Sequence, residues 1–269
     1  MRFPILCRGA MAGLLALGVI HPAGTGAAEV PPAGRLLYEE ECALCHGVAG
    51  DGEGMAAHMF QVRPRDFRRG VFKFRSTPTG SLPTDEDLFR TIRRGLPGSA
   101  MLPQDHLTEA EVRSLVAYLK TFSPRFAAEP PPTPVPIPPA PAPVAALLER
   151  GRQLYRDMKC PECHGPAGRG DGDSAGLLKD DLGRPLRPAD VARRPLKSGD
   201  GPEAIYRVLA TGVGGTGMPS YLDALTPEEL WTLVRYVESL RLSGMVDVPT
   251  RDELVARHVV QMHQPRRRR

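Results

Sequence analysis

A five-residue stretch, Cys42-Ala43-Leu44-Cys45-His46, constrains this chain more than any other feature, and it returns in the second half as Cys160-Pro161-Glu162-Cys163-His164. A Cys-x-x-Cys-His sequence is typical of a c-type haem attachment site. The two thiols each form a thioether to one vinyl group of the same porphyrin, and the adjacent imidazole then faces the iron. The sequence therefore predicts two covalently bound haem groups. Their attachment residues are Cys42, Cys45, Cys160 and Cys163, and their proximal iron ligands are His46 and His164.

The cysteines also allow two other interpretations. The chain has five cysteines, and only Cys7 lies outside the paired motifs, so none remains for a disulfide framework. Four thiols in two pairs are a ligand set for tetrahedral zinc, and the pair at 160–163 resembles a redox-active dithiol. Zinc leaves the duplicated sequence around the pairs unexplained, and no strand pattern surrounds the second pair. Haem attachment is consistent with the duplicated sequence and needs no strand near the cysteines.

The first 28 residues are typical of a secretory signal peptide. Arg2 and Arg8 give a basic start, an apolar run covers 10–20, and small residues follow at 26–28. The alternative, a membrane anchor, needs about 20 apolar residues, and this run is shorter and contains glycine. The pattern predicts export to the periplasm, which suits covalent haem attachment outside the cytoplasmic membrane.

The sequence around the motif is duplicated. Residues 29–126 and 144–241 form two units whose first motif cysteines lie 118 residues apart. In the first unit we expect a short helix before the motif, a glycine-rich loop after it, and a helix that begins near Thr84. The last helix of each unit is amphipathic and begins with a capping box, at 108–111 and 226–229. The pattern predicts an all-α protein with two tandem domains.

One methionine in each unit is the candidate for the sixth iron position. Met101 lies 55 residues after His46, and Met218 lies 54 residues after His164. Both stand in a loop with glycine and proline shortly before the last helix, and no other methionine pair is equivalent in the two units. His/Met ligation raises the reduction potential of haem iron. His106 is the alternative ligand in the first unit, although it has no counterpart in the second.

A proline beyond each histidine indicates how the imidazole is oriented. Pro64 and Pro188 are matched in the two units and lie 18 and 24 residues after the histidines. We expect a backbone carbonyl in each of these segments to accept the imidazole N–H, because such hydrogen bonds orient metal-bound histidines. The alternative is a simple turn proline.

The segment between the units is rich in proline. Nine prolines between Pro130 and Pro143 predict an extended linker over 127–143, a semi-rigid spacer able to separate the domains by up to ~40 Å. The basic tail, 242–269, ends in four arginines and is either a solvated end or a contact for anionic lipid or an acidic partner. Each unit balances its acidic and basic residues, so the net charge of +4 is no sign of nucleic-acid binding.

With these motifs, the chain resembles tandem class I cytochromes c. It is similar to dihaem carriers of the cytochrome c4 type and to dihaem subunits of respiratory oxidoreductases, over about residues 30–126 and 145–241. The resemblance implies two class I cytochrome c domains that pass single electrons between a redox protein donor and acceptor in a respiratory chain. It implies no small-molecule substrate and no enzymatic activity.

Two alternatives to a free carrier follow from the same motifs. In the first, the protein is an electron-transfer subunit of a membrane-bound or periplasmic oxidoreductase complex, docked through the linker and basic tail. In the second, it is a dihaem peroxidase, which requires an iron with an open sixth position and a nearby acid or base. Two methionine-ligated irons argue against the peroxidase.

Overall fold

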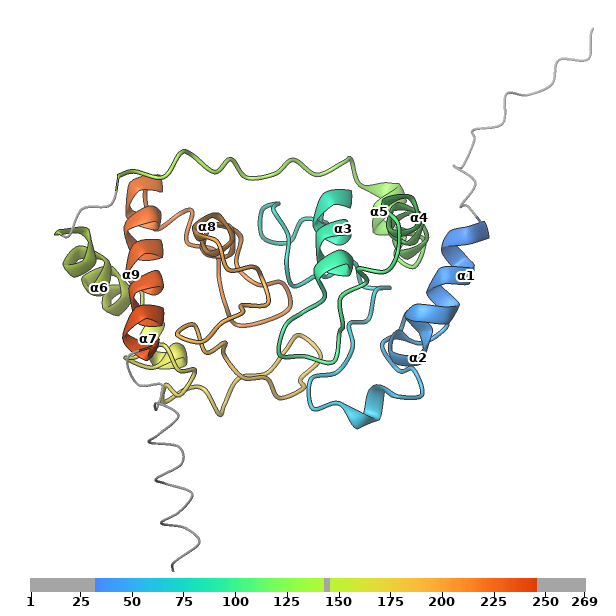
Figure 1. Ribbon diagram of the computed structural model, residues 1–269, viewed down its shortest axis with the longest axis horizontal. Helices are drawn as coiled ribbons and strands as arrows, with labels where there is room; N and C mark the ends of the chain where they lie inside the picture. The colour runs from blue at the N-terminus through green and yellow to red at the C-terminus, as the bar shows by residue number, and fades with distance from the viewer. Residues whose placement is uncertain (1–31, 143–145, 246–269) are drawn as a thin grey trace, which may run out of the picture.

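The computed structural model describes residues 32–142 and 146–245, and its regular structure is helical (Figure 1). The first unit contains α1 (Pro32–Glu41), α2 (Ala43–His46), the 3-10 helix η1 (Ala57–Met59), α3 (Asp85–Arg94), α4 (Glu109–Lys120) and α5 (Arg125–Ala128). The second contains α6 (Ala146–Asp157), α7 (Cys160–His164), α8 (Pro202–Thr211) and α9 (Pro227–Met245). Within the described ranges there is no strand, only one isolated bridge. The expected all-α fold is confirmed; the predicted signal peptide and the tail beyond 245 lie outside the described residues.

Local signals in the sequence set the helix ends as expected. Thr84 caps α3 in a reciprocal capping box with Asp87. The predicted boxes at Thr108–Glu111 and Thr226–Glu229 are present at the starts of α4 and α9. Gly95, with a φ of 60°, ends α3 because a side chain is strained in this backbone conformation.

In both units the first helix crosses the last helix at a glycine. A Cβ atom at Gly34 of α1 would overlap the carbonyl oxygen of Ser114 in α4. At the equivalent Gly151 of α6, a Cβ would lie 2.7 Å from the carbonyl oxygen of Thr232 in α9. Only glycine lets the two backbones approach so closely, and this crossing closes each unit around its apolar core.

A buried tyrosine ties the first helix of each unit to the loop after the motif. The Tyr38 hydroxyl donates to the carbonyl of Gly47 at 2.7 Å, and the Tyr155 hydroxyl donates to the carbonyl of Gly165 at 2.8 Å. Each tyrosine also packs beside an aromatic residue of the last helix, Tyr118 or Tyr236. The two cores contain mainly apolar residues of the long helices. They include Leu88, Val112, Leu115 and Val116 in the first unit and Leu154, Ile205, Leu230, Trp231, Leu233 and Val234 in the second.

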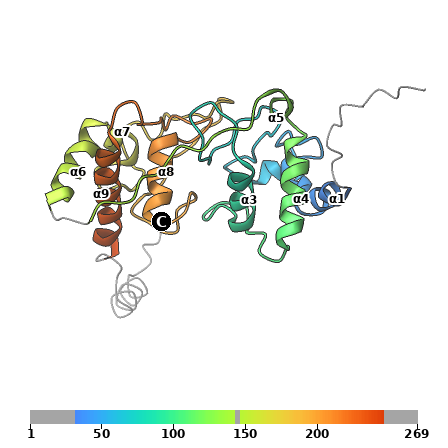
Figure 2. The ribbon, with the colours of Figure 1, turned by 90° about the horizontal axis from the view of Figure 1, so that it is seen from above.

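The two units lie side by side, with α3 and α8 facing each other at their boundary (Figures 1 and 2). A longer loop of the first unit reaches across this boundary. The stretch from Pro64 to Asp87 has seven more residues than its counterpart in the second unit. From it, Arg75 donates through Nη2 to the carbonyl of Thr211, the last residue of α8, at 2.7 Å.

A longer loop of the second unit makes the reciprocal contact. The segment between His164 and Pro188 has six more residues than its counterpart in the first unit. Its Asp181 accepts from Arg65 at 3.1 Å and from Arg69 at 2.7 Å. The domain interface is therefore built by two insertions at different places in the repeat.

The proline-rich segment is extended, as its composition predicts, but it does not hold the domains apart. It begins at Glu129, because 127 and 128 still belong to α5, and it runs along both domains (Figure 1). The Val135 N–H donates to the carbonyl of Ser76 in the first domain at 2.7 Å. The buried Trp231 of the second domain donates to the carbonyl of Pro138 at 3.0 Å. The expected spacer is thus a strap that contacts both units.

The glycine crossing leads to a stability prediction. We expect Gly151→Ala to lower the free energy of unfolding of the second domain by about 1–3 kcal/mol, because the new methyl overpacks the crossing. An ordinary helical position would respond in the opposite direction, since alanine favours helix over glycine. Denaturant unfolding of the mature protein measures the change. Gly176→Ala is the control, because a Cβ there meets nothing within 4 Å; equal stability of both variants would contradict the crossing.

Candidate haem sites

Each attachment motif lies in a short helical turn directly after the first helix of its unit. In the first unit α1 ends at Glu41 and Cys42 follows at once, whereas the second unit has an extra residue, Lys159, with a φ of 59°. Burial raises the pKa of the Cys42 thiol to about 12 and that of Cys160 to about 11. None of these four cysteines forms a disulfide, so all four thiols are available for thioether bonds.

Both histidines direct one ring nitrogen at a backbone carbonyl. His46 Nδ1 lies 3.1 Å from the carbonyl oxygen of Arg65, and His164 Nδ1 lies 2.9 Å from that of Ala189. These carbonyls belong to the residues that directly follow Pro64 and Pro188, within the two segments where an acceptor is predicted. The bond selects the tautomer with the proton on Nδ1, which leaves Nε2 free to bind a metal. Burial also lowers the pKa of both imidazoles, which favours the neutral, ligating form.

The glycine-rich loop after each motif folds back onto its histidine. Gly52 donates through its N–H to the carbonyl of His46 at 2.8 Å, and Gly170 donates to the carbonyl of His164 at 2.8 Å. Both glycines have positive φ, 77° and 73°, and a Cβ on either would press on the proline carbonyl beside it. These two glycines were not among the predicted site residues, although their separation of 118 residues, equal to that of the cysteines, marks them as part of the repeat.

The two methionine loops are closed by the same pair of hydrogen bonds. Met101 donates through its N–H to the Ser99 hydroxyl at 3.2 Å and accepts from the Leu96 N–H at 2.9 Å. Met218 donates to the Thr216 hydroxyl at 3.2 Å and accepts from the Val213 N–H at 3.1 Å. Ser99 and Thr216, whose hydroxyls hold the loops, are site residues that we did not predict from the sequence. A Ser or Thr two positions before each methionine is the signal that identifies them.

The fold brings each methionine loop to the core that also holds the first cysteine of its motif. Met101 and Cys42 both pack against the first core, and Met218 packs against the second core, which includes Cys160. Tyr221, three residues after Met218, interacts electrostatically with the Cys160 thiol. Each unit therefore gathers two thiols, one imidazole and one thioether, which is the donor set of a c-type haem with His/Met ligation. The residues fit this group, and the ligand roles themselves stay predictions.

The alternative ligand and the alternative cysteine chemistries receive no support. The His106 imidazole is exposed, and its Nε2 lies 3.3 Å from the Glu41 carboxylate. In the described part of the chain, no three His, Cys, Asp or Glu side chains come together as a metal site, so the two cysteine pairs do not share a zinc. A redox-active dithiol needs a lowered thiol pKa, and those of Cys42 and Cys160 are raised.

The surroundings of the two histidines differ. The Phe67 ring stacks on the His46 imidazole, with centroids 4.4 Å apart and an angle of 17° between the planes. The matching position in the second unit is Val191, which has no ring. Since packing and solvent exposure tune haem potentials, the two sites provide two different environments for iron.

Known proteins resemble both halves of the chain. The family model described as Cytochrome C oxidase, cbb3-type, subunit III matches residues 29–119 and again 146–237. Cytochrome c-554(547) of Halothiobacillus neapolitanus is 31% identical over 91 residues, which cover 33% of this chain and 92% of that protein. A chain of the Kuenenia stuttgartiensis reducing HAO-like protein complex is 42% identical in sequence. Its structure aligns with a TM-score of 0.77 over 79% of this chain and 97% of that chain.

The family matches confirm the expected tandem of class I cytochrome c domains, since one model matches twice. They also identify the chain as an electron-transfer protein of the cytochrome c type.

Replacing the second methionine tests the ligand assignment. We expect Met218→Ala to abolish the near-infrared band of one sulfur–iron bond and to lower the potential of that haem, within the ~0.8 V range that axial ligands set. Visible and near-infrared spectra with a redox titration measure both effects. Met158→Ala is the matched control, because it removes a thioether that packs against the same core. A full-strength band in Met218→Ala would exclude Met218 as a ligand.

Proposed function

Because both halves of the chain belong to the cytochrome c family described as Cytochrome C oxidase, cbb3-type, subunit III, we propose that the protein binds two haem c groups and transfers single electrons between redox protein partners. One observation carries this proposal. Two complete donor sets, each with its imidazole oriented by a backbone carbonyl, occur in one chain. When bound, the haem iron supplies the one-electron chemistry, so the protein needs no small-molecule substrate.

The residues of the chain hold and insulate the iron. Cys42, Cys45, Cys160 and Cys163 form the thioethers, and His46, Met101, His164 and Met218 bind the metal. Hydrogen bonds from His46 and His164 to carbonyls strengthen the imidazoles as ligands. The hydrogen-bonded methionine loops would hold the backbone of Met101 and Met218 in place for the two thioethers to bind iron.

A place within an oxidoreductase complex is the second candidate, and one observation favours it. The structure that aligns over 79% of this chain is described as part of a multi-protein HAO-like complex. By this reading the protein is an electron-transfer subunit that receives electrons from, or delivers them to, a catalytic subunit. A catalytic subunit that co-purifies with the protein and exchanges electrons with it supports this placement. A protein that is monomeric and fully active with soluble carriers contradicts it.

We further propose that the protein is exported and works in a respiratory chain outside the cytoplasmic membrane. The signal-peptide pattern of the first 28 residues supports export. The described helices include none long and apolar enough to cross a membrane. N-terminal sequencing of the mature protein checks the cleavage, which we expect near residue 28.

A reductive titration tests the proposed function. We expect the mature protein to take up two electrons per chain in two separate one-electron steps, because the two histidines lie in different surroundings. Anaerobic titration with a calibrated reductant, followed by visible spectra, measures the electron count and both potentials. Uptake of one electron, or rapid turnover of added peroxide at an open iron, would contradict a dihaem carrier.

A further inference from the structure

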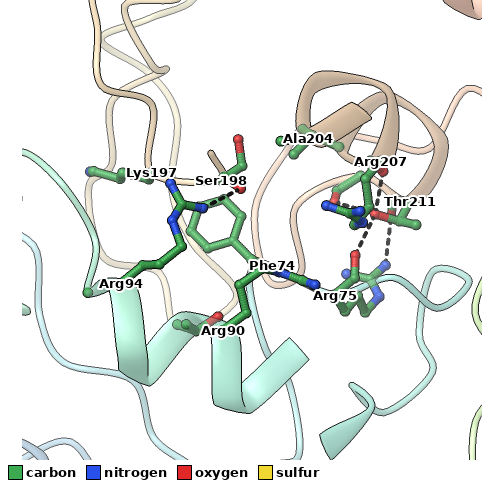
Figure 3. A pocket seen from close by; sticks show the side chains of 13 residues that line it. Phe74, Arg75, Arg90, Arg94, Lys197, Ser198, Ala204, Arg207 and Thr211 are labelled. Carbon is green, nitrogen blue, oxygen red and sulfur yellow. Dashed lines mark hydrogen bonds between the residues drawn. The ribbon is translucent and has the colours of Figure 1, made fainter. Parts of the chain in front are cut away.

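The domain boundary contains a pocket surrounded by positive charge. It lies between α3 of the first domain and α8 of the second (Figure 3), where Arg94 and Lys197 stand on one side and Arg75 and Arg207 on the other. Five of the residues that line it are cationic, and none is acidic. The five are Arg75, Arg90, Arg94, Lys197 and Arg207.

The duplication explains why like charges meet here. Arg90 of α3 and Arg207 of α8 occupy equivalent positions in the repeat, 117 residues apart. Since α3 and α8 face each other, the equivalent arginines approach across the boundary, and the charge of Arg90 works with burial to lower the pKa of Arg207. A carrier with a single domain has no such encounter.

The protein neutralises only part of this charge. Arg90 pairs with the buried Asp87, and Arg75, only 4% exposed, bonds to the carbonyls of Pro78 and Thr211. Arg94 has one long hydrogen bond to the carbonyl of Ser198.

The remaining two cations lack side-chain partners. The Lys197 ammonium and the Arg207 guanidinium form no hydrogen bond or ion pair within residues 32–142 and 146–245. Two carboxylates attract Arg207 from a longer distance, Asp87, which is paired with Arg90, and the exposed Glu203, and neither belongs to the lining. Partly buried like charges repel one another more strongly than they do in water, and an unpaired buried charge is costly.

We propose that this pocket binds an oxyanion, a carboxylate or a phosphate-type ion, which joins the two domains. Arginines in this arrangement match the paired oxygens of such groups. Two sources offer this chemistry: a free inorganic anion, or a propionate of one of the two haems. The second source rests on the proposed function, whereas the first does not.

The test compares Arg207→Gln with the wild-type protein, both fully matured, in chloride and in inorganic phosphate at equal ionic strength. Arg207 is suited to this test because its guanidinium forms no hydrogen bond or ion pair with the described residues. Arg156→Gln is the control, since it removes the same charge from an exposed position in the same domain. Arg207→Lys keeps the charge and controls for lost packing. The measurements are melting temperatures and the two haem potentials.

Each source gives its own result. If the anion is free, phosphate raises the melting temperature of the wild type saturably, and Arg207→Gln binds phosphate about tenfold more weakly. In chloride this variant then melts no lower than the wild type, because a repulsion is gone. If the anion is a propionate, Arg207→Gln melts lower in both buffers and one haem potential falls, while Arg207→Lys and Arg156→Gln stay near the wild type.

One result overturns the proposal. It is an Arg207→Gln protein that melts at or above the wild type in both buffers, with unchanged potentials and with no effect of phosphate on the wild type. This result leaves the proposed electron transfer untouched, because it concerns only the pocket and none of the predicted haem ligands is altered.

Discussion

The hydrogen bond between each partly buried imidazole and a backbone carbonyl is the constraint around which both domains are organised. His46 needs the carbonyl of Arg65, so the chain beyond Pro64 must return to the motif, and the glycine-rich loop must be tight enough to let it pass. Positive φ at Gly52 provides this tightness. The second domain repeats the whole arrangement around His164, and the repeated geometry is what distinguishes a ligand site from a satisfied core histidine.

Duplication gave the chain two similar sites and then made them different. The two domains are joined by longer loops that lie at different places in the two units. The loop with Arg75 in the first unit reaches α8, and the loop with Asp181 in the second unit reaches Arg65. Arg65 takes part in both features. Its backbone carbonyl orients His46, and its side chain forms an ion pair with Asp181 of the second domain. A shift in how the domains dock would therefore be felt at the first candidate haem site.

Much of this arrangement could be predicted from the sequence. The capping boxes, the all-α class, the tandem domains and the proline-adjacent carbonyls depend on local signals or on repetition, and both are visible in one sequence. The interface could not be predicted, because it is formed by the parts that the two units do not share. The contacts of the strap could not be predicted for a related reason: composition predicts that 129–142 is extended, but not that Trp231 donates a hydrogen bond to it.

The intact mass of the mature protein tests the central claim most directly. We expect one species that lacks the first 28 residues and carries two haems, with no thiol left to alkylate after denaturation, since all four remaining cysteines are consumed as thioethers. A mass with one haem or none, or free thiols at Cys160 and Cys163 in otherwise mature protein, would contradict the claim that both halves of this chain are haem sites.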